Sequence, residues 1–91
     1  MEVEFSDDAN DHLIFFKKTG QVSILKKIRK LIESMQETPL EGIGKPEALK
    51  HNLSGFWSRR IDRENRILYK IIDETIWIYS LKGHYYLFTS K

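Results

Sequence analysis

The sequence predicts an α+β domain in which a two-helix hairpin packs on one face of an antiparallel β-sheet. Two stretches in the first half of the chain carry apolar residues at helical spacing, and Gly20 separates them. The second half contains three short runs rich in β-branched and aromatic residues, with short polar turns between them. With 91 residues the chain is long enough for one hydrophobic core, so we expect a single domain over residues 1–91.

The chain is expected to open with a strand and a helix. Residues 1–5 alternate between apolar and acidic side chains, which is typical of a half-buried strand. Ser6 suits the N-cap position, because its hydroxyl can accept a hydrogen bond from an amide of the first helical turn. Ala9 and Phe16 then share a helical face, and Gly20 marks the end of the helix.

A second helix is expected from Ser23, a candidate N-cap, to the Thr38-Pro39 pair, where proline disfavours helical geometry in the preceding residue. Its bases at 26–30 face away from the core. Its apolar face is formed by Ile24, Ile28, Leu31 and Met35. The two helices are close in sequence and should form an antiparallel hairpin.

Three strands are expected after the helices. Residues 40–55 are rich in glycine and predict a long loop with one turn at 47–50. Residues 56–61, 66–72 and 75–81 predict an antiparallel meander, because only short turns separate them. The N-terminal strand is expected to join the same sheet.

Side-chain alternation along the strands predicts which residues lie on each face of the sheet. Ile67 and Tyr69 are expected to face the helices. Arg60, Arg66 and Lys70 are then expected on the open face, where a ligand could lie.

The composition excludes several classes of protein. The chain has no cysteine, so no disulfide framework or thiolate metal site can form. It has no apolar run near the ~20 residues of a membrane helix, and its acidic start differs from a signal peptide. His12, His51 and His84 lack the spacing of metal ligands, so we expect neither a metal nor another cofactor. These features predict a soluble cytoplasmic protein with no membrane partner.

The formal net charge is only +2, so the distribution of charge is more informative than its size. Residues 1–11 are acidic, whereas bases gather within 17–30 and within 45–70. The first basic block is expected to be the solvated face of a helix. The second contains Phe56 and Trp57 among its bases, which are Lys45, Lys50, Arg59, Arg60, Arg63, Arg66 and Lys70. It predicts a small binding site for a polyanion.

These residues match the needs of RNA cleavage without a metal. A base must take the proton of a 2′-hydroxyl, cations must stabilise the phosphoryl oxygens, and an acid must protonate the departing 5′-oxygen. Glu47 could act as the base and His84 as the acid. Arg66, with Lys50 and Arg60, could supply the cations.

Each residue taken alone also has a structural explanation. Glu47 lies between lysines and could form a surface ion pair. Arg66 could pair with Asp62 or Glu64, and His84 could serve only packing. Spacing alone therefore leaves both explanations open.

A longer pattern favours the catalytic explanation. The run Gly-Lys-Pro-Glu-Ala-Leu-Lys-His-Asn-Leu-Ser-Gly-Phe-Trp-Ser-Arg-Arg-Ile at 44–61, Glu-Asn-Arg-Ile-Leu-Tyr at 64–69 and His-Tyr at 84–85 closely resemble the YoeB/Txe toxins of the RelE superfamily. The resemblance covers almost the whole chain. It implies a RelE-like fold and the toxin of a type II toxin–antitoxin pair, a ribosome-dependent endoribonuclease (an mRNA interferase) that cuts messenger RNA at the 30S A site of bacteria.

The resemblance also implies a role for each site residue. Glu47 falls on the general base, Arg66 on the residue that stabilises the transition state, and His84 on the general acid, with Tyr85 beside it. Supporting contacts to RNA phosphates fall on Lys50 and Arg60, with Lys45 in the same basic block. The partners implied are messenger RNA on the ribosome and a cognate antitoxin, and a homodimer is a further expectation.

The chain departs from the family pattern at two places. Asn65 stands where family members commonly have histidine. Residues 86–91 form an extra C-terminal tail beyond the usual final tyrosine, and a tail that packed over the site would affect His84 and Tyr85. The alternative function is therefore a catalytically weakened RelE-like module that mainly binds a cognate antitoxin.

Overall fold

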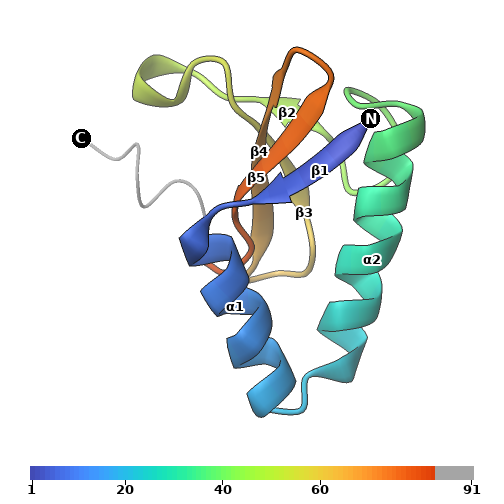
Figure 1. Ribbon diagram of the computed structural model, residues 1–91, viewed down its shortest axis with the longest axis vertical. Coiled ribbons are helices and arrows are strands. Elements are labelled where there is room, and N and C mark those ends of the chain that lie inside the picture. The colour runs from blue at the N-terminus through green and yellow to red at the C-terminus, as the bar shows by residue number, and fades with distance from the viewer. Residues whose placement is uncertain (84–91) are drawn as a thin grey trace.

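The computed structural model describes residues 1–83, which form two α-helices and five strands (Figure 1). The elements in chain order are β1 (Glu2–Phe5), α1 (Asp7–Lys18), α2 (Val22–Glu37), β2 (Glu47–Ala48), the short 3₁₀ turn η1 (His51–Leu53), β3 (Trp57–Arg60), β4 (Arg66–Ile72) and β5 (Thr75–Ser80). The strand order in the sheet is β1-β5-β4-β3-β2. Figure 1 shows α1 and α2 joined by a tight turn as an antiparallel pair. The α+β class and the helical hairpin are confirmed.

The sheet differs from the prediction in two details. The N-terminal strand β1 pairs in parallel with β5, so the sheet is mixed and not antiparallel throughout. Alternation of apolar and polar residues specifies the buried face of a strand but is the same for either strand direction. The second difference is β2, a two-residue edge strand that replaces the turn expected at 47–50.

The helix ends follow the predicted chemistry in one case and not in the other. Ser6 caps α1, since the amide of Ala9 donates to its Oγ at 3.1 Å. The N-cap predicted at Ser23 is wrong: α2 begins at Val22, and Gln21 occupies the cap position without a side-chain bond. The Gln21 amide instead donates to the Phe16 carbonyl at 2.9 Å, so the tight turn from α1 sets where α2 starts.

The core lies between the helical hairpin and one face of the sheet. Its buried members are Ala9, Phe16, Ile28, Leu31, Met35, Ile61, Ile67, Tyr69, Ile76, Ile78 and Leu81. The helical members, together with Ile67 and Tyr69, are apolar positions that periodicity predicted. In the part of the chain that is described, no helix is both long and apolar enough to cross a membrane.

Gly44 and Gly20 form a matched pair for testing the packing around the loop after α2. Both have positive φ, +84° and +69°, so alanine at either site costs about 1–2 kcal/mol of backbone strain. A Cβ on Gly44 would also lie 2.5 Å from Leu31 Cδ2, whereas one on Gly20 would meet nothing within 4 Å. We expect Gly44→Ala to lower the free energy of unfolding by roughly 1–3 kcal/mol more than Gly20→Ala. Equal losses in urea unfolding would contradict this packing.

Candidate active site

The face of the sheet away from the helices, called the open face below, carries three of the predicted site residues, Glu47, Arg60 and Arg66. Glu47 lies directly opposite Ser58, and Ser58 lies directly opposite Leu68, across three neighbouring strands. Residues directly opposite in an antiparallel pair project to the same face. Ile67 and Tyr69, which alternate with Leu68, are in the core, so this row points away from the helices.

Arg60 and Arg66 form the next row on the open face. They lie directly opposite each other on β3 and β4, and Arg60 is exposed. Two like charges directly opposite each other on a sheet repel, and an anion between them would relieve that repulsion. Arg60 is two residues beyond Ser58, so this pair lies one row from Glu47 on the same face.

The two lysines of the predicted site flank Glu47 in the chain. Lys45 and Lys50 are both exposed, one before β2 and the other at the N-cap position of η1. Between them Leu49 is 7% exposed and its amide donates to the Phe56 carbonyl at 2.9 Å. This anchor holds the segment against β3, so the predicted loop is an ordered edge of the sheet at this place.

Aromatic side chains extend the open face beyond the arginines. Phe56 contacts Tyr79 edge to face, with ring centroids 4.9 Å apart. Lys70 Nζ lies 4.9 Å from the centroid of the Phe56 ring. Lys70 is directly opposite Trp77, which places both on the open face as predicted for Lys70. Trp57, by contrast, packs against the core.

Arg59 is a correction to the predicted polyanion site. The sequence places it among the bases of the 45–70 block, but its side chain is completely buried on the helix side of β3. Its Nε donates to the Tyr69 hydroxyl at 3.1 Å. Burial raises the pKa of Tyr69, and the contact with Arg59 acts in the opposite direction. The guanidinium therefore belongs to the interior and not to the anion site.

Asn65 joins the turn before β4 to the end of the described chain. Its Nδ2 donates to Asp62, and its Oδ1 accepts the Gly83 amide at 2.9 Å. The Arg66 amide donates to the Gly83 carbonyl at 3.1 Å. The start of β4 thus holds Gly83 from both sides of its backbone. The predicted residues His84 and Tyr85 follow Gly83 and lie outside the described residues.

Ser58 has an unusual environment between Glu47 and Leu68 on the open face. It is 1% exposed, and its Oγ is buried with no hydrogen-bond partner in the described range 1–83. Buried hydroxyls of this kind are rare, because an unmade hydrogen bond costs about 1–3 kcal/mol. No pattern in the sequence indicated this residue, since serine on a strand is common.

His12 lies on α1 and is partly buried. Its Nδ1 accepts the Leu81 amide at 3.0 Å, so the neutral ring is needed for this bond. Burial lowers the pKa of His12 from its ordinary 6.5, and Lys82 acts in the same direction. Asp8 and Asp11 oppose the shift.

The His12 bond predicts a pH dependence of stability. The unfolded chain takes up a proton near pH 6.5, whereas the folded chain does so only at lower pH. The stabilisation is therefore present above pH 6.5 and is lost as the pH falls through that value. Urea unfolding between about pH 7.5 and pH 5 should show this decline, and His12→Gln should reduce it. If the free energy of unfolding fell equally with pH in the wild-type protein and in His12→Gln, His12 would not be the group responsible.

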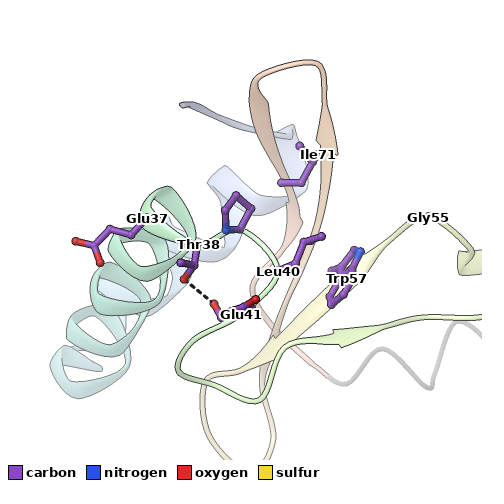
Figure 2. A pocket seen from close by; sticks show the side chains of 8 residues that line it. Glu37, Thr38, Leu40, Glu41, Gly55, Trp57 and Ile71 are labelled. Atoms are coloured by element: carbon purple, nitrogen blue, oxygen red, sulfur yellow. Dashed lines mark hydrogen bonds between the residues drawn. The ribbon is translucent and has the colours of Figure 1, made fainter.

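One well-formed pocket of about 530 Å³ lies away from these residues (Figure 2). Its lining is Glu37, Thr38, Pro39, Leu40, Glu41, Gly55, Trp57 and Ile71. Trp57 and Ile71 pack against the core, so the pocket is on the helix side of the sheet. Among residues 1–83, its lining includes none of the predicted site residues. Within residues 1–83 no three His, Asp or Glu side chains gather as metal ligands would.

Comparison with known proteins agrees with the fold and identifies the family. A family model for the YoeB-like toxin of bacterial type II toxin–antitoxin system matches residues 5–85. The chain is 45% identical over 85 residues to Toxin YoeB of Escherichia coli strain K12, which covers 93% of this chain and 100% of that protein.

Solved structures give the same result. The YoeB/ParE toxin from Agrobacterium tumefaciens is similar with a TM-score of 0.89 and 32% identity, covering 93% of this chain and 100% of that one. YoeB from Staphylococcus aureus, solved in a heterotetrameric complex with YefM and also as a dimer, is 42% identical. The match to the complex has a TM-score of 0.84 and covers 93% of this chain and 98% of that one. The chain therefore belongs to the YoeB-like toxins, the toxin components of bacterial type II toxin–antitoxin systems.

Proposed function

We propose that the protein is a ribosome-dependent endoribonuclease that cuts messenger RNA at the 30S A site without a metal and so inhibits translation. The observation that carries the proposal is the Arg60–Arg66 pair, directly opposed on the open face one row from Glu47. Two guanidinium groups and a carboxylate side by side suit a phosphodiester with a neighbouring hydroxyl.

Each residue has one role in the proposed reaction. The Glu47 carboxylate takes the proton of the 2′-hydroxyl, whose oxygen attacks the adjacent phosphorus. Arg66 stabilises the negative charge on the phosphoryl oxygens. The phosphorus–O5′ bond breaks, and His84, with Tyr85 beside it, gives a proton to the leaving oxygen. The products are a 2′,3′-cyclic phosphate, which can open to a 3′-phosphate, and a 5′-hydroxyl. Contacts to the phosphates are assigned to Lys45, Lys50 and Arg60.

The limited charge of the protein supports a requirement for the ribosome. Each phosphate neutralised by Lys or Arg strengthens binding through counterion release, so holding a free strand needs many bases. Here the net charge is +2, and residues 1–11 hold acids and no lysine or arginine. A codon already held in place removes much of the ordering cost.

The test compares one message with and without ribosomes at equal, physiological salt. We expect cleavage of ribosome-bound message at low protein concentration, and cleavage of free RNA only at large excess. Comparable rates in the two samples would contradict the requirement. Growth arrest on expression without a partner, relieved by Glu47→Ala, separates the toxin from a weakened module that only binds an antitoxin.

An antitoxin is the proposed protein partner, as YefM is for the Staphylococcus aureus relative. An acidic or apolar segment of the antitoxin, disordered when free, would cross the open face and neutralise Arg60 and Arg66. A complex that contacts only the helical hairpin and leaves residues 45–70 open would contradict this placement. A homodimer is proposed for the free toxin, as found for the same relative, and the cytoplasm is its proposed location.

A further inference from the structure

The Arg59 side chain is a buried cation, and its hydrogen-bond acceptors are an unusual set for a buried charge. It is 0% exposed, and all of its partners among residues 1–83 are neutral. Its Nε bonds the Tyr69 hydroxyl, and its Nη1 bonds Ser34 Oγ at 2.9 Å. The remaining acceptors are the carbonyl oxygens of Thr38, Pro39, Glu41 and Ile43. Burying a guanidinium without a carboxylate is costly, so this cluster calls for an explanation beyond packing.

The carbonyls that Arg59 binds belong to the loop between α2 and β2. This loop forms neither helix nor strand, so its carbonyls have no ladder donors, and the N–H groups of one guanidinium supply bonds to four of them. The Tyr69 hydroxyl also donates to Pro39, at 2.9 Å. Thr38 Oγ1 joins the Glu41 carbonyl at 3.0 Å, the dashed contact in Figure 2. The loop is thus wrapped around Arg59.

Gly42 shows how closely the loop approaches the guanidinium. Its φ is +114°, and a Cβ there would lie 2.4 Å from Ser34 Oγ and 3.2 Å from Arg59 Nη1. Only a residue without a side chain fits at this distance. The same loop presents Leu40 outward, 47% exposed, beside Trp57 in the pocket of Figure 2.

The loop held by Arg59 leads directly to Glu47. Ile43 gives the last carbonyl to Arg59, and the next carbonyl, of Gly44, accepts the Arg60 amide at 2.7 Å. β2 begins three residues later and is only two residues long, at the edge of the sheet. A strand this short has few ladder bonds of its own, so its position depends on the segments at its two ends.

We propose that Arg59 is a positioning residue for Glu47: its buried guanidinium fixes residues 38–44 and so holds the Glu47 carboxylate beside the Arg60–Arg66 pair. This inference rests on the proposed function for the role of Glu47. The adjacent arginines then divide the work between the two faces of β3. Arg60 faces the substrate, and Arg59 fixes the base from behind the sheet.

Arg59→Lys is the most direct variant, because it keeps the charge but cannot bond four carbonyls at once. We expect single-turnover cleavage of ribosome-bound message to slow by about 10- to 100-fold at saturating ribosomes with little change in KM, since a displacement near 1 Å has that effect on a reacting group. In a Glu47→Ala background the same change should slow the residual cleavage by less than about twofold. If Arg59→Lys slowed cleavage in the Glu47→Ala background by the same roughly 10- to 100-fold factor, Arg59 would not act through Glu47.

Amide hydrogen exchange tests the clamp without any nuclease activity. In Arg59→Lys the amides of Arg60 and Leu49, which bond across to the two ends of the β2 segment, should exchange at least about 10-fold faster. The Ser6 amide, which bonds Ile78 on the far side of the sheet, should be unchanged. Unchanged exchange at Arg60 and Leu49 would overturn the proposal. If exchange changes as expected but neither the wild-type protein nor any variant cleaves message, the positioning of residues 38–44 by Arg59 stands and the proposed function fails.

Two further variants serve as controls. Ile28→Val removes one methyl group from the core on α2, away from the loop, and should lower the thermal midpoint while leaving the cleavage rate of the folded protein unchanged. Tyr69→Phe removes only the hydroxyl that joins Arg59 to Pro39. If Arg59→Lys does not fold, Tyr69→Phe should reproduce its pattern of exchange and cleavage more weakly. If Ile28→Val lost as much cleavage as Tyr69→Phe, the loss would follow from lower stability alone, and Arg59 would contribute only to the stability of the fold.

Discussion

Replacing Glu47 by alanine is expected to slow cleavage of ribosome-bound message by roughly 10²- to 10⁴-fold, the contribution that a general base normally makes. Glu47→Gln should lose nearly as much, because the amide keeps the shape of the side chain but cannot take the 2′-hydroxyl proton. Both variants should fold normally, since Glu47 is exposed on an edge strand.

Glu64→Ala is the matched control for Glu47. Glu64 is also an exposed carboxylate of the 45–70 block, but it lies in the turn between β3 and β4. Its loss should change the rate by less than about threefold, in line with the small energy of exposed charges. A Glu47→Gln protein that keeps the wild-type rate, or a Glu64→Ala protein as slow as Glu47→Ala, would contradict the assignment of the base.

Arg66→Ala is expected to slow the same reaction by roughly 10²- to 10³-fold, the usual effect of removing one group that stabilises the charge of a transition state. Arg66→Lys should recover only part of the rate, because an ammonium group cannot make the paired hydrogen bonds of a guanidinium to a phosphate. The loss should be mainly in kcat, since Arg60 remains to hold the ground-state phosphate.

Arg63→Ala provides the comparison for Arg66. Arg63 is exposed in the turn at 62–65 and carries the same charge near the same strands. If Arg66 acted only through the general positive potential, the two variants would lose similar rates and the loss would shrink at high salt. Equal rate losses in Arg63→Ala and Arg66→Ala would therefore show that Arg66 acts only by attracting RNA through its charge.

The sequence predicted the elements whose side chains repeat regularly. Successive side chains of a strand point to opposite faces of the sheet, so alternation alone assigns each residue to a face. It correctly predicted that Ile67 and Tyr69 lie in the core. It also correctly predicted the open face for Arg60, Arg66 and Lys70. The strand at 66–72 has the predicted bounds. These features depend on local sequence, which a single chain contains in full.

Features that depend on distant partners were beyond this kind of prediction. The two-residue strand β2 exists because Glu47 and Ala48 meet β3, and nothing in their own composition indicates a strand. Arg59 and Arg60 are adjacent and chemically identical, yet one lies in the interior and the other on the open face. The carbonyls of the loop after α2, with the Ser34 and Tyr69 hydroxyls, make the buried position tolerable for Arg59, and all of these acceptors are distant in sequence.

Asn65 shows the same limit at the edge of the site. The sequence showed only that Asn65 stands at a position where the family resemblance implies histidine, but in the structure its Oδ1 accepts the Gly83 amide at the end of the neighbouring strand. A hydrogen bond between a side chain and a backbone amide eighteen residues away cannot be recognised from the periodicity of the sequence. Asn65 and the Arg66 amide together hold the residue that precedes His84.

Cleavage of a ribosome-bound message carrying one 2′-deoxy sugar at the scissile position tests the central claim most directly. If Glu47 activates the 2′-hydroxyl as the attacking group, that single substitution should abolish cutting at its position, while a 2′-deoxy sugar one nucleotide away should leave it intact. The all-ribose message should yield a 2′,3′-cyclic phosphate or 3′-phosphate and a 5′-hydroxyl, also in the presence of a chelator at a concentration that leaves the ribosomes intact. Continued cutting at the deoxy position would contradict the account.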